Sequence, residues 1–456
     1  METLDLYDSF SYIHSLAYSF IGVQTIYLAT YFPAVYWNTA CLRVDSGLEE
    51  TASTDYNKIA KAVGNIIYRG IAISLIDINK SQYMFEPDEE NNQIIYGMKA
   101  LNGVGGEVIQ EIVDNRPYTS VDDFMSKVSI NRTGMLSLIK SGAFDQFDNR
   151  FNIMKQYILD ISEPKKRLTL QNFNGLLEKD LIPQELDFSR RVFVFNKVFR
   201  KHQKGDYLIF DQSNLYAFYE KFFDVDLLEP IDSHLGILQK TWKKIYDKEM
   251  LPAKKYIQEN QETLLEKYNG SLFQDMWNKY VSGNLATWEM DSLGMYYHEH
   301  ELAKVNKTLY NIVEYSSLSK EPVVDYYFKR NDRQIPIYKT NRIMGTVVAK
   351  DDTHSIISIL TVNSGVVNVK MSRDYFARYN RQISEEFPDG TKKVVEKGWF
   401  TRGTLVVVNG IRRGDLFITK SYKNTPSHQL YKITNVNIGN GTIDMTNCRY
   451  GEEEDI

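Results

Sequence analysis

The chain has 456 residues, 43% of them hydrophobic and 13% aromatic, and its formal net charge is −5. This is enough apolar material for roughly two to four folded domains, and the negative charge excludes a protein that coats nucleic acid through overall basicity. The two cysteines, Cys41 and Cys448, each lack a second cysteine nearby, which excludes a disulfide framework and a cysteine-based zinc site.

Membrane insertion and export are not predicted. No uninterrupted apolar run approaches the ~20 residues of a membrane span, and the N-terminus lacks a basic region followed by an apolar one. We therefore expect a folded protein of a reducing cytoplasm, with no membrane partner.

Two helices are predicted over residues 9–43. Apolar side chains recur there at intervals of three and four residues, and Pro33 marks the corner between the helices. His14 and Tyr18 lie four apart on one helical face. Packing is the simpler interpretation of that pair, ahead of catalysis. A further amphipathic helix is expected over 58–67, followed by short extended segments at 71–75 and 94–96.

A glycine hairpin follows within residues 97–113. Met98 and Leu101 precede a Gly103-Val104-Gly105-Gly106 turn, and helical spacing resumes after it, which predicts two short helices packed across the turn. Glycines let the backbone approach a ligand, and the second helix would direct unpaired N–H groups outward, as phosphate binding requires. The alternative is an ordinary helical hairpin, because a lone glycine pair is a weak motif. The predicted DNA-binding residues of this hairpin are Lys99, Gly103, Val104, Gly105 and Gly106.

A second, degenerate hairpin is predicted over residues 117–145. Its helical segments lead into Lys140-Ser141-Gly142, which we predict as further DNA contacts. Residues 151–287 look helical in pattern and are rich in aromatic side chains. They include a basic segment that either lies along DNA phosphates or is a solvated face; its residues are Arg190, Arg191, Lys197, Arg200, Lys201 and Lys204.

From Arg342 onward, short β-branched runs broken by Gly, Asn and Asp predict a five-stranded barrel of the OB type. Within residues 370–413, ten basic residues stand against five acidic ones, with aromatic residues between them. This mixture is typical of single-strand binding surfaces. We give the same weight to the alternative, in which the aromatic residues fill the barrel and the charges solvate its surface. The predicted single-strand surface is Lys370, Arg373, Arg378, Trp399, Arg412 and Arg413.

Several blocks together carry a family resemblance. They are residues 18–42, 76–81 with Phe85, 95–105, 138–145 and 288–296 with His300. In this order and spacing the chain resembles the C-terminal half of a bacterial-type C-family replicative DNA polymerase, the DNA polymerase III alpha subunit. Asp291 stands where the family usually has Glu, and Glu301 where it usually has Pro.

The resemblance implies a multidomain protein whose N-terminal two thirds are mainly α, followed by a small all-β OB-fold-like barrel. Its expected parts are the end of the polymerase fingers (1–95), tandem helix-hairpin-helix units (96–150), a helical connecting region (151–334), an OB domain (335–450) and an acidic tail (451–456). His14 matches a histidine that the family places near the incoming nucleotide, together with Tyr18. Tyr12 stands where the family has a lysine two residues earlier, so that lysine contact to the nucleotide has no counterpart at this position.

The catalytic palm of the family has no counterpart in this sequence. Asp224-Val225-Asp226 is the one D-x-D pair considered, and it follows the hairpins whereas the family's palm precedes the fingers. We therefore expect no metal and no cofactor bound by this chain, with Mg²⁺ in the palm of a partner chain or segment. The chain would be a fragment or one product of a split gene, of bacterial or phage origin, and unable to polymerise alone. Two rivals are a standalone DNA-binding module and a metal nuclease that uses Asp224 and Asp226.

Double- and single-stranded DNA and a palm-bearing polymerase chain are the expected partners. A sliding clamp is a further one, because the resembled polymerases bind clamps through a Gln-x-x-Leu-Phe peptide. Gln212, Leu215 and Tyr216 fit that form with Tyr in place of Phe. Leu215 and Tyr216 could equally belong to a buried helical stripe, which is the favoured interpretation.

Overall fold

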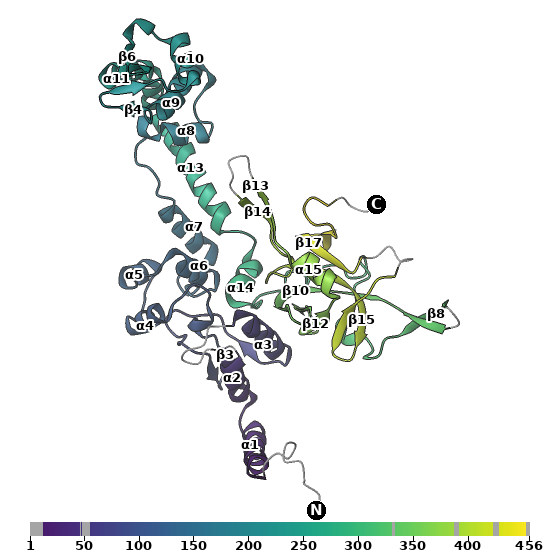
Figure 1. Ribbon diagram of the computed structural model, residues 1–456. Coiled ribbons are helices and arrows are strands. Elements are labelled where there is room, and N and C mark those ends of the chain that lie inside the picture. Colours follow the sequence, from purple (N-terminus) through teal and green to yellow (C-terminus); the bar gives the residue numbers. More distant parts are fainter. Residues whose placement is uncertain are drawn as a thin grey trace, which may run out of the picture. The chain divides into compact units, whose positions relative to one another are not determined.

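The computed structural model describes residues 12–45, 47, 55–330, 333–386, 392–422 and 428–452. The chain divides into two compact units, one formed by 1–154 together with 282–456 and the other by 155–281. Helices dominate the N-terminal two thirds and a β-barrel follows, so the predicted fold class is confirmed (Figure 1).

The first helices of unit 1 follow the predicted pattern. They are α1 (Tyr12–Tyr31), α2 (Ala34–Asp45) and α3 (Tyr56–Tyr68). Pro33 separates α1 from α2, as expected of a residue that cannot continue a helix. The Asp55 carboxylate caps α3 by accepting from the backbone N–H groups of Asn57 and Lys58. None of the helices in the described part of the chain combines the length and apolarity needed to span a bilayer.

The hairpin region joins a small sheet to four helices. Its elements are β1 (Ala72–Ile73), β2 (Glu86–Asp88), β3 (Gln93–Ile95), the 3₁₀ turn η1 (Met98–Ala100), α4 (Gly106–Asp114), α5 (Val121–Lys127), α6 (Arg132–Lys140) and α7 (Arg150–Ile161). Asn79, in the loop between β1 and β2, fastens that loop to the start of the second hairpin, because its side-chain amide donates to the Tyr118 carbonyl (2.9 Å) and accepts from the Tyr118 N–H (2.8 Å). Arg116 adds a guanidinium hydrogen bond to the Ile78 carbonyl at 2.8 Å.

Helix α14 (Leu285–Leu293) and the segment after it are fastened to the hairpin region through a buried carboxylate. Glu289 is fully buried, and its oxygens accept from Arg150 Nη1 (3.2 Å), His298 Nδ1 (2.6 Å) and two backbone N–H groups. Gly294 ends the helix in the left-handed conformation, and a Cβ there would stand 2.8 Å from the Ala60 Cβ on α3. The family-like residues of this segment therefore hold the fold together.

Five strands close the barrel. They are β10 (Asn341–Asp351), β11 (Ile356–Leu360), β12 (Val366–Lys370), β15 (Leu405–Arg413) and β16 (Leu416–Thr419). The order is β10-β11-β12-β16-β15, with β15 pairing back onto β10 and with β12 and β16 parallel. Helix α15 (Arg373–Asn380) stands between β12 and the later strands, as in an OB fold. The predicted barrel and its five strands are confirmed.

Two hairpins and a two-strand extension complete unit 1. Their bounds are β8 (Val324–Arg330), β9 (Arg333–Tyr338), β13 (Ile383–Glu386), β14 (Lys392–Glu396), β17 (Leu430–Asn437) and β18 (Thr442–Thr446), with the 3₁₀ turn η5 (Tyr315–Ser317) before β8. Near the C-terminus, Glu452 accepts from Arg378 Nη2 (2.6 Å) and from the Arg449 N–H (2.9 Å). Glu452 of the predicted acidic tail is thus bound to two arginines, and residues 453–456 lie outside the described residues.

Unit 2 contains a sheet that the sequence pattern did not predict. Its elements are η2 (Leu170–Asn172), α8 (Phe173–Glu178), η3 (Gln184–Leu186), α9 (Asp187–Phe199), β4 (Gln203–Lys204), β5 (Tyr207–Ile209), α10 (Ser213–Phe222), η4 (Val225–Leu227), β6 (Glu229–Ile231), β7 (His234–Leu238), α11 (Gln239–Glu249), α12 (Leu251–Glu259) and α13 (Gln261–Tyr280). The strands pair in the order β4-β5-β7-β6. Trp242, Phe199 and Tyr219 fill the core between this sheet and its helices. The wholly helical interpretation of this region was wrong because the strands are only two to five residues long.

His300 provides a pH test of how α14 and the barrel are joined. Its Nε2 faces the Leu360 carbonyl at 3.2 Å and its Nδ1 accepts from the Leu302 N–H, so the neutral ring satisfies both nitrogens. Burial lowers the pKa of His300 from 6.5 to about 4. The unfolded chain therefore binds more protons between these two pH values.

We expect the contribution of His300 to stability to be lost as pH falls from 6.5 toward 4, by at most about 1.4 kcal/mol per pH unit. Nuclear magnetic resonance of the histidine rings, assigned with His300→Gln, should show no protonation of His300 at pH 6. Titration near pH 6.5 would contradict this burial.

Candidate nucleic-acid interface

The first glycine hairpin has the backbone geometry of a tight turn before a helix. Gly103 adopts a left-handed φ of +84°, and Gly105 is extended and precedes the first residue of α4. The predicted helix before the turn is only the 3₁₀ turn η1. It is this short because Leu101 leaves the helical conformation (φ −80°, ψ 133°) and ends the turn at Ala100.

Helix α6 of the second hairpin locks this turn in place. A Cβ on Gly103 would lie 2.7 Å from Thr133 Cγ2, and one on Gly134 would lie 2.9 Å from the Gly103 carbonyl oxygen. The Ser137 hydroxyl donates to the Asn102 carbonyl at 2.5 Å. Glycine is therefore required at both positions by the close approach of the turn to α6.

The N-terminus of α4 has no side-chain cap. Its N-cap is Gly105, whereas Ser120 caps α5 and Asn131 caps α6 with side-chain oxygens. The first turn of an α-helix has N–H groups without intrahelical partners and the positive end of the dipole. Gly105 is exposed, and a Cβ there would meet nothing within 4 Å. This arrangement can bind an anion such as a backbone phosphate.

Two side chains flank this helix end. Lys99 is half-buried and its ammonium lies 5.8 Å from the centroid of the Tyr83 ring. A Cβ on Gly106 would lie 3.3 Å from Tyr83 Oη, so the phenol stands beside the start of α4. Sequence reasoning missed Tyr83. Tyr83 lies outside the glycine motif in sequence. The β2–β3 hairpin, which lies between Tyr83 and α4 in the chain, folds back and brings the Tyr83 ring to the start of α4.

The second hairpin uses its predicted DNA contacts within the fold. Ser141 is fully buried and donates to the Leu138 carbonyl, while Lys140 is mostly buried with its ammonium 3.7 Å from Asp291. Gly142 has a φ of +84°, and a Cβ would press on Arg150 Nη2 at 2.4 Å. These three residues have structural roles, and we do not assign DNA contacts to them.

Of the cations predicted to bind single-stranded DNA, some are exposed and others form ion pairs or hydrogen bonds within the protein. Lys370, Arg373 and Arg413 are exposed. Arg378 pairs with Glu452, and Arg412 donates to the carbonyls of Gly414, Tyr315 and Leu318.

Trp399 is wholly buried, with its indole N–H donating to Glu396 Oε1 at 2.6 Å. It therefore cannot stack on a base. The prediction for this residue is wrong, and the alternative that aromatic residues fill the barrel holds here.

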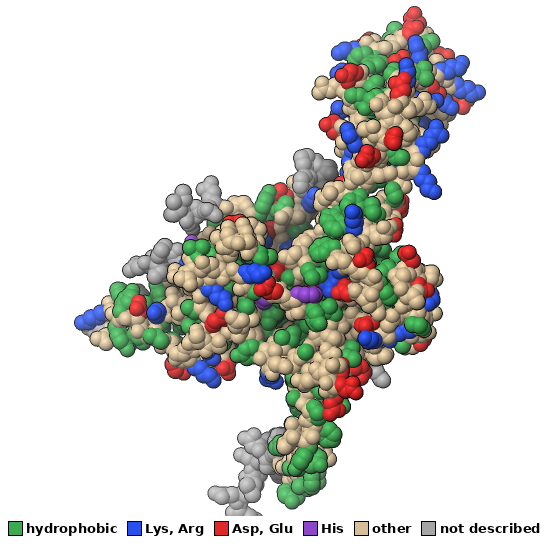
Figure 2. Space-filling view, turned by 180° about the vertical axis from the view of Figure 1, so that it is seen from behind, with side chains coloured by type: hydrophobic (Ala, Val, Ile, Leu, Met, Phe, Trp, Pro, Cys, Tyr) green, Lys and Arg blue, Asp and Glu red, His purple; other side chains and the backbone are tan. Residues whose placement is uncertain are grey.

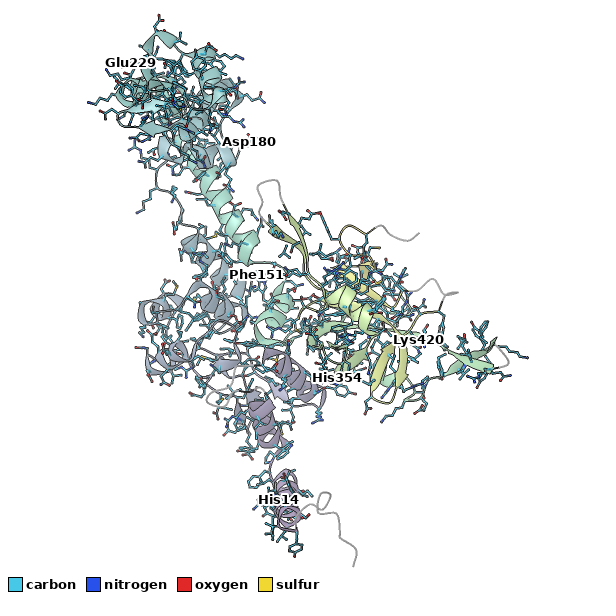
Figure 3. All side chains as sticks on the ribbon, viewed as in Figure 1. His14, Phe151, Asp180, Glu229, His354 and Lys420 are labelled. Atoms are coloured by element: carbon cyan, nitrogen blue, oxygen red, sulfur yellow. The ribbon has the colours of Figure 1, made fainter. Side chains whose placement is uncertain are left out.

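His14 and Tyr18 lie on α1, where Figure 3 labels His14. No residue of α1 is buried, and large apolar side chains are exposed on every side of it. The structure brings neither residue to a nucleotide-like site, so their predicted role stays a prediction.

Asp224 and Asp226 form a turn. Asp224 caps η4 by accepting from the Asp226 N–H at 3.0 Å. Across the described residues, no group of three or more His, Cys, Asp or Glu side chains could hold a metal ion. The pair thus has a local structural role, and the nuclease hypothesis gains no support from its geometry.

The clamp-like peptide begins α10. Leu215 is buried in the core of unit 2, Tyr216 packs at its edge, and Gln212 is exposed at the N-cap position. A clamp could reach Leu215 only if α10 left this core. The burial of Leu215 thus favours the interpretation that these residues pack in a helical core over the interpretation that they bind a clamp.

Comparison with known proteins supports a polymerase relationship. The model of the helix-hairpin-helix motif matches residues 70–153. Over 97% of its length the chain is 40% identical to the probable DNA polymerase YorL of Bacillus subtilis, and equally to the DNA-directed DNA polymerase of Bacillus phage SPbeta. The DNA polymerase III alpha subunit of Borreliella burgdorferi is 31% identical over 46% of the chain and 18% of that subunit. The resemblance inferred from the sequence blocks is confirmed. The chain spans 35% of the length of each of the two Bacillus relatives.

The buried position of Leu215 can be tested by stability. Leu215→Ala should cost about 2–5 kcal/mol, because it opens a cavity in a packed core, whereas Gln212→Ala should cost less than about 0.5 kcal/mol. Chemical denaturation followed by tryptophan fluorescence, to which Trp242 in the same core contributes, measures both. Equal small effects would mean that Leu215 is accessible.

Proposed function

We propose that this chain is the DNA-binding C-terminal portion of a replicative DNA polymerase of the DNA polymerase III alpha type. The observation that carries the proposal is the uncapped N-terminus of α4, presented by the Gly103–Gly105 turn within a matched helix-hairpin-helix segment. The extended similarity to polymerases supports it. The similarity to polymerases and the geometry of the α4 N-terminus both support DNA binding.

The hairpin would bind duplex DNA through its backbone. The free N–H groups at the start of α4 would donate to phosphate oxygens, and Lys99 would add a positive charge beside them. Such contacts position a protein on DNA without reading bases, because phosphates carry no sequence information. A polymerase that copies templates of any sequence needs such sequence-independent contacts.

Nucleotide transfer would come from a palm-bearing chain or segment, which would hold Mg²⁺ with clustered carboxylates. The apolar surface of α1 supports a protein partner. Residues 9–42 include no Asp, Glu, Lys or Arg, and no side chain of α1 is buried. A surface this apolar is normally covered by another protein surface. We propose that α1 packs against the remaining polymerase fingers and palm.

A clamp tether through Gln212, Leu215 and Tyr216 is a separate hypothesis, which requires α10 to detach. The alternative function is a standalone DNA-binding module without a catalytic role. It shares the hairpin but needs no partner for α1, so partner binding separates the two.

The duplex-binding role predicts a selective effect at Gly105. Gly105→Val should fold normally, because its φ of −74° suits any residue and its Cβ direction is open. The added methyl groups would stand where a phosphate approaches, and duplex affinity should fall roughly tenfold. Fluorescence anisotropy with a labelled duplex measures the affinity.

The matched control is Gly270→Val on α13, where a Cβ is equally unobstructed. It should bind duplex DNA like the wild type. Unchanged binding by folded Gly105→Val would refute the phosphate role of the hairpin.

The partner role of α1 predicts that charge will abolish assembly. Val23→Asp/Ile26→Asp places carboxylates among side chains that are now exposed and apolar. Co-purification with the palm-bearing polymerase chain of the same genome should be lost, while duplex binding remains. Val194→Asp, at an exposed site on α9, is the control. Assembly that survives the double substitution would favour the standalone module.

A further inference from the structure

The β8–β9 ribbon, formed by Val324–Arg330 and Arg333–Tyr338, is a two-stranded hairpin beside the barrel. Tyr326 pairs with Ile337, and Phe328 pairs with Ile335. Because side chains alternate along a strand, these four lie on one face. These four residues form an apolar stretch with two aromatic rings on the same strand, and Arg333 follows on the same face toward the ribbon tip.

Solvent reaches this apolar face. Tyr326 is 49% exposed, Phe328 53% and Ile335 40%, and Tyr327 on the opposite face is 60% exposed. A two-stranded hairpin buries too little to require such residues for its own stability. Exposed contiguous apolar surface of this kind marks an interaction site.

The base of the ribbon is held to the barrel by hydrogen bonds. The Tyr338 N–H donates to Tyr422 Oη (2.9 Å), and the Gly414 N–H donates to the Lys320 carbonyl (2.7 Å). Arg412 Nη1 donates to the Leu318 carbonyl (2.9 Å), and its guanidinium lies 4.3 Å from the Tyr315 ring centroid. The ribbon is anchored at its base while its aromatic residues remain accessible.

Charge on and around the ribbon is positive. From Lys320 to Arg342 the sequence carries six basic residues against three acidic ones. Lys329 and Arg333 are exposed near the ribbon tip. In Figure 2, where the ribbon lies at the left, hydrophobic and basic side chains occur together on it. This charge favours a polyanion over an apolar protein surface.

We propose that the β8–β9 ribbon is a stacking platform for single-stranded nucleic acid. Tyr326 and Phe328 are two residues apart on one face, about 6.8 Å, so each ring can carry one unstacked base. Arg333, on the same face as these rings, can then meet the sugar-phosphate backbone. Stacking tolerates any base because each has a π face, which suits a template of any sequence.

This site differs from the surface expected at residues 370–413. Phe376, Tyr379, Trp399 and Phe400 are buried there and cannot stack. The exposed aromatic residues that single-strand binding requires occur instead on the ribbon. Arg412 contributes by anchoring the ribbon base.

The test uses the full chain with fluorescein-labelled dT20 and, separately, a labelled 20-base-pair duplex at low salt. Tyr326→Ser/Phe328→Ser changes only exposed rings, so the fold should survive, as circular dichroism checks. We expect at least a tenfold loss of dT20 affinity. Tyr297→Ser/Leu309→Ser, at two other exposed sites, should bind dT20 like the wild type.

The charge component has its own readout. Arg333→Gln should lower the slope of log Kd against log salt for dT20 by roughly 0.7, because it removes one phosphate contact. Unchanged dT20 affinity in the folded aromatic variant overturns the proposal, as does a wild-type chain that binds no dT20 but captures a protein through the ribbon.

Duplex binding separates this result from the function proposed above. The ribbon variants should bind the duplex with wild-type affinity, because the α4 hairpin carries that contact. Loss of dT20 binding by the ribbon variant together with duplex binding that is insensitive to Gly105→Val would support the ribbon and overturn the hairpin role. The reverse pattern would overturn the ribbon alone.

Discussion

The contact between the Gly103 turn and α6 is the constraint on which the proposed DNA grip depends. Thr133 and Gly134 approach the turn so closely that glycine is needed on both sides, and Ser137 fixes the Asn102 carbonyl. The Gly103 turn also determines where α4 begins. An uncapped helix end is a useful anion site only if it is held still, and the second hairpin supplies that rigidity. The second hairpin thus has a structural role beside the first.

Buried polar side chains link distant segments of unit 1 by hydrogen bonds. Asn79 bridges to Tyr118, Glu289 gathers Arg150 and His298, and His300 reaches the Leu360 carbonyl. Each satisfies groups that would be costly to bury unpaired. Asn79, Glu289 and His300 belong to the blocks that carry the family resemblance, yet their roles here are structural. The proposed binding chemistry lies instead in backbone N–H groups and exposed rings.

Sequence periodicity predicted the elements whose patterns are long and regular. The helices around Pro33, the amphipathic α3 and the five barrel strands lie where three- to four-residue or two-residue spacing placed them. The strands β4–β7 were missed because they are very short and lie among aromatic residues compatible with either helix or strand.

Burial was harder to predict than secondary structure. Trp399 and Tyr326 look alike in sequence, since both are aromatic residues close to cations. Only the closed barrel determines that Trp399 is inside it and Tyr326 is on an open ribbon. Tyr83 likewise reaches α4 through the β2–β3 hairpin, a tertiary contact that no local pattern encodes. The glycine turn was predictable because its signal is local, whereas its locking by α6 was not.

The most direct measurement of the central claim is a duplex DNA titration followed at backbone amides. With ¹⁵N-glycine labelling, and Gly105 and Gly106 assigned by substitution, phosphate binding at α4 predicts that these two amide signals shift most and that the shifts diminish with added salt. Large shifts at barrel glycines such as Gly345 or Gly410, with Gly105 and Gly106 unmoved, would contradict the claim that the hairpin holds the DNA.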